Sequence, residues 1–122
     1  MATNHAQRKA LGDFGERLAE RHLRERGYIV LDRNWRCREG EIDIVAKDAQ
    51  TLVICEVKTR SSDRFGTAYE AITPAKAERL YRLGRHWARD HAVVSSRLRV
   101  DVVAVLIPPH GPRQIEHVEG VG

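Results

Sequence analysis

The fold is decided by the stretch Gly40–Arg60, which reads Gly-Glu-Ile-Asp-Ile-Val-Ala-Lys-Asp-Ala-Gln-Thr-Leu-Val-Ile-Cys-Glu-Val-Lys-Thr-Arg. Apolar and charged residues alternate in its first half, and its second half is an apolar run, Leu52–Cys55, that continues into Glu56 and Lys58. Both halves have the pattern of β-strands. An ionised group near the end of a buried strand costs on the order of several kcal/mol unless it is paired. Asp43, Glu56 and Lys58 therefore require compensation.

The register of the two strands follows from the turn between them. A two-residue loop at Ala49-Gln50, within the reversal Asp48–Thr51, places Asp43 directly opposite Glu56 on one face of an antiparallel pair. Lys58 shares that face because side chains repeat at every second residue, whereas a three-residue loop would move Asp43 to the other face. Adjacent carboxylates repel unless a proton or a divalent cation lies between them. We predict the two-residue loop, or another register that keeps Asp43 and Glu56 on the same face. The nearby lysine favours the cation.

An acidic residue on one strand, followed by a hydrophobic strand that ends in Glu-x-Lys, resembles the PD-(D/E)XK superfamily and its restriction-endonuclease-like fold. Over nearly the whole chain the sequence looks like the YraN-like family of small uncharacterised bacterial proteins, which is grouped by resemblance with Holliday junction resolvases. The phrases that carry this resemblance are Gly-Glu-Ile-Asp-Ile-Val-Ala from Gly40, Glu-Val-Lys-Thr-Arg from Glu56, Phe65-Gly66 and Glu70-Ala71-Ile72. The resemblance implies a nuclease whose catalytic residues are Asp43, Glu56 and Lys58.

Length and composition bound the class of protein. The chain has 122 residues, and we expect a single nuclease-like domain over residues 1–122, with residues 1–6 flexible. Hydrophobic residues make up 42% and charged residues 31%, which fits a globular chain and not a disordered one. The 21 Lys and Arg exceed the 17 Asp and Glu, so the net charge is +4. This balance is compatible with a nucleic-acid partner.

The sequence predicts a soluble cytoplasmic protein with no membrane partner. The N-terminal residues Met1–Lys9 are polar and lack the apolar core of a signal peptide. A later apolar run, Val102–Ile107, is too short to span a bilayer. Cys37 and Cys55 have no metal-ligand spacing, and we expect both to be reduced thiols.

The remaining pattern predicts two helices and three more strands. Helical spacing runs from about Gln7 to Arg26 and again from Thr73-Pro74 to about Asp90. The added strands are Tyr28–Leu31 with its continuation Arg33–Arg38, then Arg97–Ile107 and Gln114–Val118, so that residues 28–59 form a three-stranded meander. The order α-β-β-β-α-β-β predicts an α/β sandwich around a mixed central sheet of about five strands flanked by helices, as the resemblance to the nuclease fold also implies.

Further carboxylates are candidates near the acid pair. From its position on the flank of the first helix, Glu16 is an ordinary solvated glutamate. The resemblance implies a metal ligand instead, because many resolvase-like members supply a glutamate from that helix. Glu41 shares the face of Asp43 and is the reserve carboxylate. Asp43 and Glu56 with help from Glu16 would suffice for Mg²⁺ (or Mn²⁺), which takes a few carboxylates plus waters and substrate oxygens.

Several basic residues are candidate contacts to nucleic acid. They are Arg36, Arg38, Arg60, Arg64 and Lys76. Arg36 and Arg38 flank Trp35, which either stacks on bases or fills the core. Arg60 and Arg64 lie in or next to the polar loop that leaves the proposed site, where Phe65 could stack on a base. The resemblance implies that Lys76 holds a phosphate.

Other charged and polar residues have simpler interpretations. Arg82, Arg85 and Arg89 form a stripe at helical spacing that we interpret as a solvated face, while Lys76 and Arg79 are expected to point elsewhere. Asp101 shares a face with Arg99 and is expected to pair with an arginine, and His22 is expected to be a core histidine. These residues are not predicted ligands.

Together the patterns and the resemblance predict a metal-dependent endonuclease that hydrolyses phosphodiester bonds in DNA, with branched or otherwise structured DNA as the expected substrate. Mg²⁺ would act as a Lewis acid and lower the pKa of a bound water, and Lys58 would orient or deprotonate the water or neutralise developing charge. Two alternatives stay open: a non-catalytic nucleic-acid-binding module, and a protein-interaction adaptor in which the three charged residues form a structural salt-bridge cluster. A homodimer would double the basic surface and supply two active sites.

Overall fold

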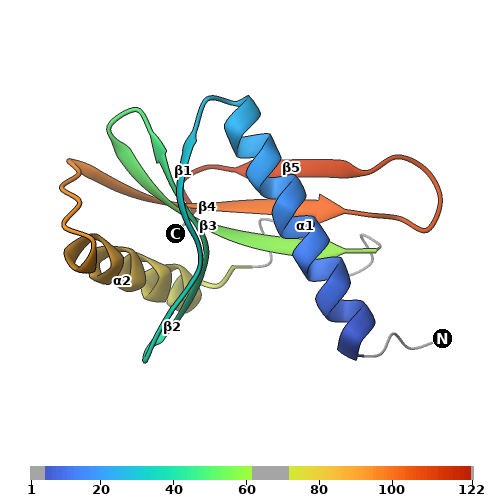
Figure 1. Cartoon of the computed structure of the whole chain (residues 1–122), viewed down its shortest axis with the longest axis horizontal. Helices are drawn as coiled ribbons and strands as arrows, with labels where there is room; N and C mark the ends of the chain where they lie inside the picture. The colour runs from blue at the N-terminus through green and yellow to red at the C-terminus, as the bar shows by residue number, and fades with distance from the viewer. Residues whose placement is uncertain (1–4, 62–71, 122) are drawn as a thin grey trace.

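A computed structural model describes residues 5–61 and 72–121, which form two helices and one five-stranded sheet (Figure 1). In chain order the elements are α1 (His5–Glu25), β1 (Ile29–Cys37), β2 (Gly40–Asp48), β3 (Thr51–Arg60), α2 (Pro74–Asp90), β4 (Arg97–Leu106) and β5 (Gln114–Val118). This is the order that the sequence predicts, so the mixed α/β fold class is confirmed. The helix α1 begins two residues before its predicted start, and β4 ends one residue earlier than predicted.

The strands lie in the sheet in the order of the chain, β1-β2-β3-β4-β5. Neighbouring strands are antiparallel except for β3 and β4, which run parallel from Thr51↔Arg97 to Arg60↔Leu106. A parallel pair needs a crossover connection, and α2 lies within the segment that connects these two strands. The sheet is therefore mixed, as predicted, with β3 at its centre.

The β2–β3 hairpin has the predicted two-residue loop. Its pairs run from Asp48↔Thr51 to Ile44↔Cys55, so Ala49 and Gln50 form the turn. Ala49 has a φ of 52°, in the left-handed region that tight hairpin turns require. The next pair in this register after Ile44↔Cys55 is Asp43 opposite Glu56.

The two helices cover opposite faces of the sheet (Figure 1). On one face Ala19 and Leu23 of α1 pack against a set of buried residues that includes Ile44. On the other face Leu80 and Trp87 of α2 pack with Ile54, Val100 and further apolar residues. The core thus has two layers of apolar side chains, one on each face of the sheet.

Local capping explains where α2 begins. Thr73 has an extended backbone and its Oγ1 accepts a hydrogen bond from the N–H of Lys76 at 3.1 Å, while Pro74 occupies the first helical position. This is the predicted helix start, and α2 ends at Asp90 as predicted. The cap fixes the first turn, which positions the Lys76 side chain.

Neither helix of the described residues combines the length and the apolar character that a membrane span requires.

Candidate active site

The acid pair lies where β2 and β3 separate. The pairing of the two strands extends to Ile44↔Cys55, and beyond it the N–H of Val57 donates to Asp43 Oδ2 at 2.9 Å. A side-chain carboxyl thus takes the place of a backbone acceptor at this point of the sheet. Glu56, on the neighbouring strand, is 8% exposed. The structure therefore brings the predicted carboxyl groups together in a largely buried position.

The pKa of Asp43 is raised in this position. Burial raises the pKa of Asp43 to about 8, the charge of Glu56 adds to the rise, and the hydrogen bond from Val57 opposes it. A hydrogen bond joins the side chains of Asp43 and Glu56. Near neutral pH, Asp43 accordingly carries the proton and Glu56 carries the charge.

Two lysines surround the charged member of the pair. Glu56 Oε2 lies 3.7 Å from Lys58 Nζ and forms a closer ion pair with Lys76 Nζ. Burial raises the pKa of Glu56, but hydrogen bonds from Lys76 and Asp43 and the charges of both lysines outweigh burial, so the pKa lies below its usual value. The charge of Glu56 is thereby stabilised by cationic side chains from a strand and a helix.

The two lysines differ in their basicity. Burial lowers the pKa of Lys58, and the neighbouring Lys76 lowers it further, against the opposing charges of Glu56 and Asp43. Burial also disfavours the charged form of Lys76, but its hydrogen bond and ion pair with Glu56 outweigh this and raise its pKa. Lys58 is thus the more acidic ammonium group, which suits a lysine that exchanges a proton during a reaction.

Glu16 lies at the edge of this cluster. A Cβ at the preceding residue, Gly15, would overlap the side chain of Thr59, so glycine allows α1 to approach β3 closely there. Burial raises the pKa of Glu16, and the charge of Arg33 and a hydrogen bond with Asn34 oppose the rise. The negative charge of Glu16 also contributes to the raised pKa of Asp43. Glu16 therefore acts on the acid pair electrostatically, while its hydrogen bond with Asn34 joins it to β1.

The other predicted site residues are more scattered. Glu41, the reserve carboxylate, forms an exposed ion pair with Arg36 at 2.9 Å. Arg38 is exposed, and the backbone carbonyl of Arg60 accepts a hydrogen bond from Ile107 at 2.8 Å. The predicted contacts Arg64 and Phe65 lie outside the described residues. Lys76 is at the site, where the structure pairs it with Glu56.

Trp35 is half-buried and packs against the apolar layer beneath α2. Its ring meets that of His86 edge to face, with centroids 5.2 Å apart. This position agrees with the alternative in which Trp35 fills the core. The arginines beside it, Arg36 and Arg38, are solvent-exposed.

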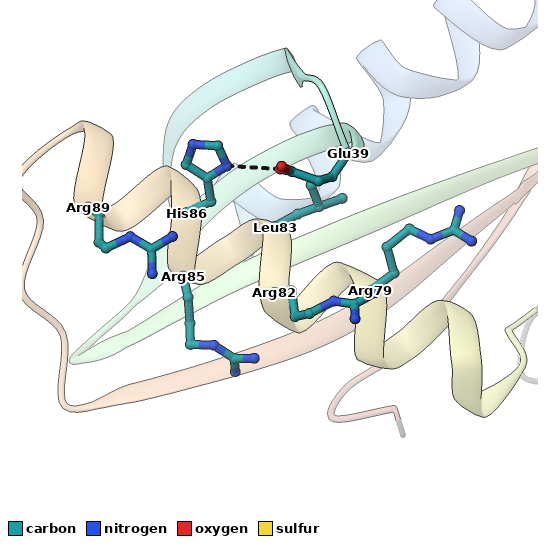
Figure 2. Close-up of a pocket in the computed structure, with 7 residues that line it drawn as sticks. All are labelled: Glu39, Arg79, Arg82, Leu83, Arg85, His86 and Arg89. Carbon is teal, nitrogen blue, oxygen red and sulfur yellow. Dashed lines mark hydrogen bonds and ion pairs between the residues drawn. The ribbon is translucent and has the colours of Figure 1, made fainter.

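An arginine-rich groove follows one flank of α2 (Figure 2). It encloses about 590 Å³ and is lined by Glu39, Arg79, Arg82, Leu83, Arg85, His86 and Arg89. The sequence predicts the stripe of Arg82, Arg85 and Arg89, but the expectation that Arg79 points elsewhere is wrong, because this side chain lines the same groove. Its spacing of three residues before Arg82 was the signal that could have found it.

Cys37, Glu39 and His86 bring ligand types for a metal together, although the sequence shows no metal-ligand spacing. Cys37 Sγ donates to Glu39 Oε2 at 3.3 Å, and His86 Nδ1 lies 3.2 Å from the same oxygen. The hydrogen bond from Cys37, with that from His86, lowers the pKa of Glu39. Hydrogen bonding accounts for this grouping, which the sequence concealed because His86 comes from a distant element.

Asp101 belongs to a separate structural network. This fully buried carboxylate accepts hydrogen bonds from Arg99 at 2.8 Å and from the backbone of Gly120 at 3.1 Å, and it lies 2.9 Å from His117 Nε2. Burial raises the pKa of Asp101, but these hydrogen bonds outweigh burial and lower it. The predicted arginine partner is confirmed. His22 also contacts His117, at 3.2 Å.

The fold and site define a mixed α/β protein whose central strands hold a buried acid pair bracketed by two lysines. The chain belongs to the uncharacterised protein family UPF0102, whose model matches residues 15–105. It is 57% identical over 113 residues to a UPF0102 protein from Kineococcus radiotolerans, covering 92% of this chain and 93% of that protein. It is 49% identical over 117 residues to a UPF0102 protein from a Nocardioides species, covering 96% and 94%. The predicted family is confirmed, and the matched region includes Glu16, the acid pair and both lysines.

Proposed function

We propose that this protein is a metal-dependent endonuclease that hydrolyses phosphodiester bonds in DNA, with branched or otherwise structured DNA as its substrate. The observation that carries the proposal is the meeting of Asp43, Glu56 and Lys58 at the point where β2 and β3 separate. A buried acid pair that shares one proton has a perturbed pKa, as groups at reactive sites commonly do. The resemblance to resolvase-like nucleases supports the choice of DNA as substrate.

The residues present fit a divalent cation. Asp43 and Glu56 provide carboxylate oxygens, which Mg²⁺ and Mn²⁺ prefer, and Glu16 is close enough to influence the charge of Asp43. The ammonium group of Lys76 against Glu56 shows that the site already accommodates a positive charge. Binding a cation would require Asp43 to lose its proton. When bound, the metal would stabilise charge on phosphate oxygens and lower the pKa of a water.

The side chains of the chain itself would divide the remaining work. Lys58 is half-buried and has a lowered pKa, so it is suited to orient a water, to accept its proton or to neutralise developing charge. The Lys76 side chain is long and flexible, so its ammonium group could move from Glu56 to a phosphate while the backbone of α2 stays in place.

A cleavage experiment tests this function. Labelled duplex, single-stranded, flap and four-way-junction DNA would be incubated with Mg²⁺ or Mn²⁺ and with wild type, Asp43→Asn or Lys58→Ala. Asp13→Asn provides the control, because Asp13 is an exposed carboxylate paired with Lys9. We expect products from wild type and the control only. Equal cleavage by all four preparations would indicate a contaminating nuclease and would remove the support for this site.

Metal binding provides a readout that does not depend on turnover. In a calorimetric titration with Mn²⁺, we expect wild type and Asp13→Asn to bind alike and Asp43→Asn to bind at least about tenfold more weakly, a difference of about 1.4 kcal/mol. Unchanged Mn²⁺ affinity on losing the Asp43 carboxylate would contradict its assignment as a ligand.

One observation favours a second candidate. Glu56 is buried against both Lys58 and Lys76, which is the arrangement expected of a structural salt-bridge cluster in a protein-interaction adaptor. This alternative predicts neither Mn²⁺ affinity nor nucleic-acid affinity.

A non-catalytic nucleic-acid-binding module is the third possible function. It predicts nucleic-acid binding that weakens with salt, without cleavage products. The two assays above, together with oligonucleotide binding, distinguish the three functions.

A further inference from the structure

The arginine-rich groove on α2 consists of Arg79, Arg82, Arg85 and Arg89 together with Glu39, Leu83 and His86. Figure 2 shows the arginines following one another along the helix, while His86 reaches toward Glu39 at the turn between β1 and β2. The groove lies on a different part of α2 from Lys76, which contacts the acid pair from the first turn. It is therefore a separate surface of the same helix.

The arginines of the groove have no acidic partner within residues 5–61 and 72–121. Arginines elsewhere form ion pairs: Arg21 with Glu25 at 3.0 Å, Arg24 with Glu20 at 2.8 Å and Arg36 with Glu41 at 2.9 Å. Glu39, the acid that lines the groove, is already engaged by Cys37 and His86. The groove thus concentrates positive charge that the described part of the chain leaves unneutralised.

The concentration of arginines lowers the stability of α2. Arg85 and Arg89 are four residues apart on one face, and like charges at this spacing destabilise a helix. Glu78 stands four residues before Arg82, the spacing for a stabilising pair, yet no ion pair joins them in the described structure. A solvated stripe would gain from such pairs, whereas a surface that binds an anion needs its guanidinium groups available.

The spacing fits an extended polyanion. At a rise of about 1.5 Å per residue, the arginines from Arg79 to Arg89 cover about 15 Å of helix. A strand of duplex DNA carries one phosphate per about 3.4 Å of axis, so this length faces about four phosphates. Leu83 is the apolar member of the lining, and backbone contacts of this kind position a nucleic acid without reading its bases.

We propose that this groove binds the phosphate backbone of a nucleic-acid strand. The helix begins at the acid pair, so a strand held along α2 is directed toward Lys76 and Glu56. The direction toward the site rests on the proposed endonuclease function, whereas the binding itself does not. An acidic or phosphorylated peptide is the competing occupant, and it is less favoured because the arginines extend along three turns of the helix.

Oligonucleotide binding without divalent metal tests the groove apart from cleavage. Fluorescence anisotropy with labelled single-stranded and duplex DNA, in the presence of a chelator, would compare wild type with an Arg82→Ala, Arg85→Ala, Arg89→Ala variant. The control variant Arg21→Ala, Arg24→Ala, Arg26→Ala changes the net charge equally, and its arginines have acidic partners. Thermal denaturation of each protein would verify that it is folded.

We expect the groove variant to lose at least about tenfold in affinity and the slope of log K against log salt to fall by roughly 2 to 3, the change for three lost phosphate contacts. The control should retain its affinity within about threefold. Equal losses in both variants would attribute binding to net charge and overturn the proposal. The proposal would also be overturned if the wild-type protein bound a phosphorylated peptide but neither oligonucleotide.

The outcomes separate the groove from the endonuclease function. Asp43→Asn leaves the groove arginines in place and should bind oligonucleotides like wild type. Normal cleavage by a groove variant that also binds normally would refute the groove and leave the endonuclease intact. Weakened binding by the groove variant, with no cleavage by wild type on any substrate, would support the groove and refute the endonuclease.

Discussion

Protonation of Asp43 allows its carboxyl group to be buried beside that of Glu56 without a second negative charge. The sequence predicts that a proton or a cation must lie between Asp43 and Glu56, and the neighbouring lysine favoured the cation. In the structure, burial raises the pKa of Asp43 so that it holds a proton near neutral pH, and two ammonium groups lie against Glu56. The acid pair could be predicted because strand alternation fixes its geometry. The ion pair with Lys76 could not, because it depends on how α2 packs against the sheet.

The shared proton predicts how stability depends on pH. The pKa of Asp43 is about 8 in the folded chain and about 3.9 in an unfolded one. Between these values the folded chain binds more protons, so its free energy of unfolding falls as the pH rises. Asp43→Asn removes this loss. From pH 5 to pH 8 we expect the free energy of unfolding of the variant to rise by about 4 kcal/mol relative to that of wild type, at about 1.4 kcal/mol per pH unit.

Urea denaturation at a series of pH values measures this difference. Asp13→Asn, at an exposed carboxylate, should follow the wild-type pH profile. Parallel profiles for wild type and Asp43→Asn would show that Asp43 titrates at an ordinary pKa.

Lys76 provides a second prediction at this scale. Lys76→Met leaves the buried Glu56 with Lys58 as its ion-pair partner among the described residues. The free energy of unfolding should fall by about 1–2 kcal/mol, less than for a fully buried pair because Lys76 is partly exposed. Adding Glu56→Gln to this variant should recover part of the loss. A double-mutant cycle by urea denaturation measures the coupling, and additive losses would mean that the ion pair contributes nothing.

At the scale of elements, the sequence predicted each helix, but it did not predict how closely the helix approaches the sheet. The first helix includes Gly12 and Gly15, and helical spacing places Gly15 on the apolar stripe with Leu11 and Leu18. In the structure a Cβ at Gly12 would meet nothing within 4 Å, whereas one at Gly15 would overlap Thr59. The requirement at Gly15 arises from a strand more than forty residues away, so spacing within the helix could not reveal it.

This difference predicts opposite effects of one substitution. Alanine favours a helix over glycine by about 1 kcal/mol, so Gly12→Ala should stabilise the chain by up to that amount. Gly15→Ala should instead destabilise it by about 1–3 kcal/mol, because α1 must shift away from β3. Adding Thr59→Ala should restore part of the stability. Thermal or urea denaturation of the three variants measures these stability changes. Stabilisation by Gly15→Ala would contradict the close contact between α1 and β3.

At the scale of the whole molecule, the order of elements and the central register followed from alternation, turn residues and caps. These are local signals, and they specified the β2–β3 hairpin and the start of α2. The grouping of Cys37, Glu39 and His86 and the full extent of the arginine groove required the tertiary packing of α2 beside the β1–β2 turn. The sequence therefore predicted the acid pair on adjacent strands better than the surface that a partner would contact.

The placement of the acid pair and the groove on different parts of the molecule predicts that their functions separate. A cation bound at Asp43 and Glu56 stabilises the folded chain, by about 2.7 kcal/mol at a concentration one hundred times its dissociation constant. Mn²⁺ should therefore raise the melting temperature of wild type and of the Arg82→Ala, Arg85→Ala, Arg89→Ala variant, but not that of Asp43→Asn. The rise should be larger at pH 8 than at pH 6, because the cation must displace the proton from Asp43.

Oligonucleotides should give the reverse pattern in the same melting experiment. In the presence of a chelator they should stabilise wild type and Asp43→Asn, and they should stabilise the groove variant less, because a ligand shifts the melting temperature only of the protein that binds it. Each variant thus controls for the other. If the groove variant lost the response to Mn²⁺ as well, the acid pair and the groove would behave as one coupled site, and the assignment of cation and phosphate backbone to separate surfaces would fail.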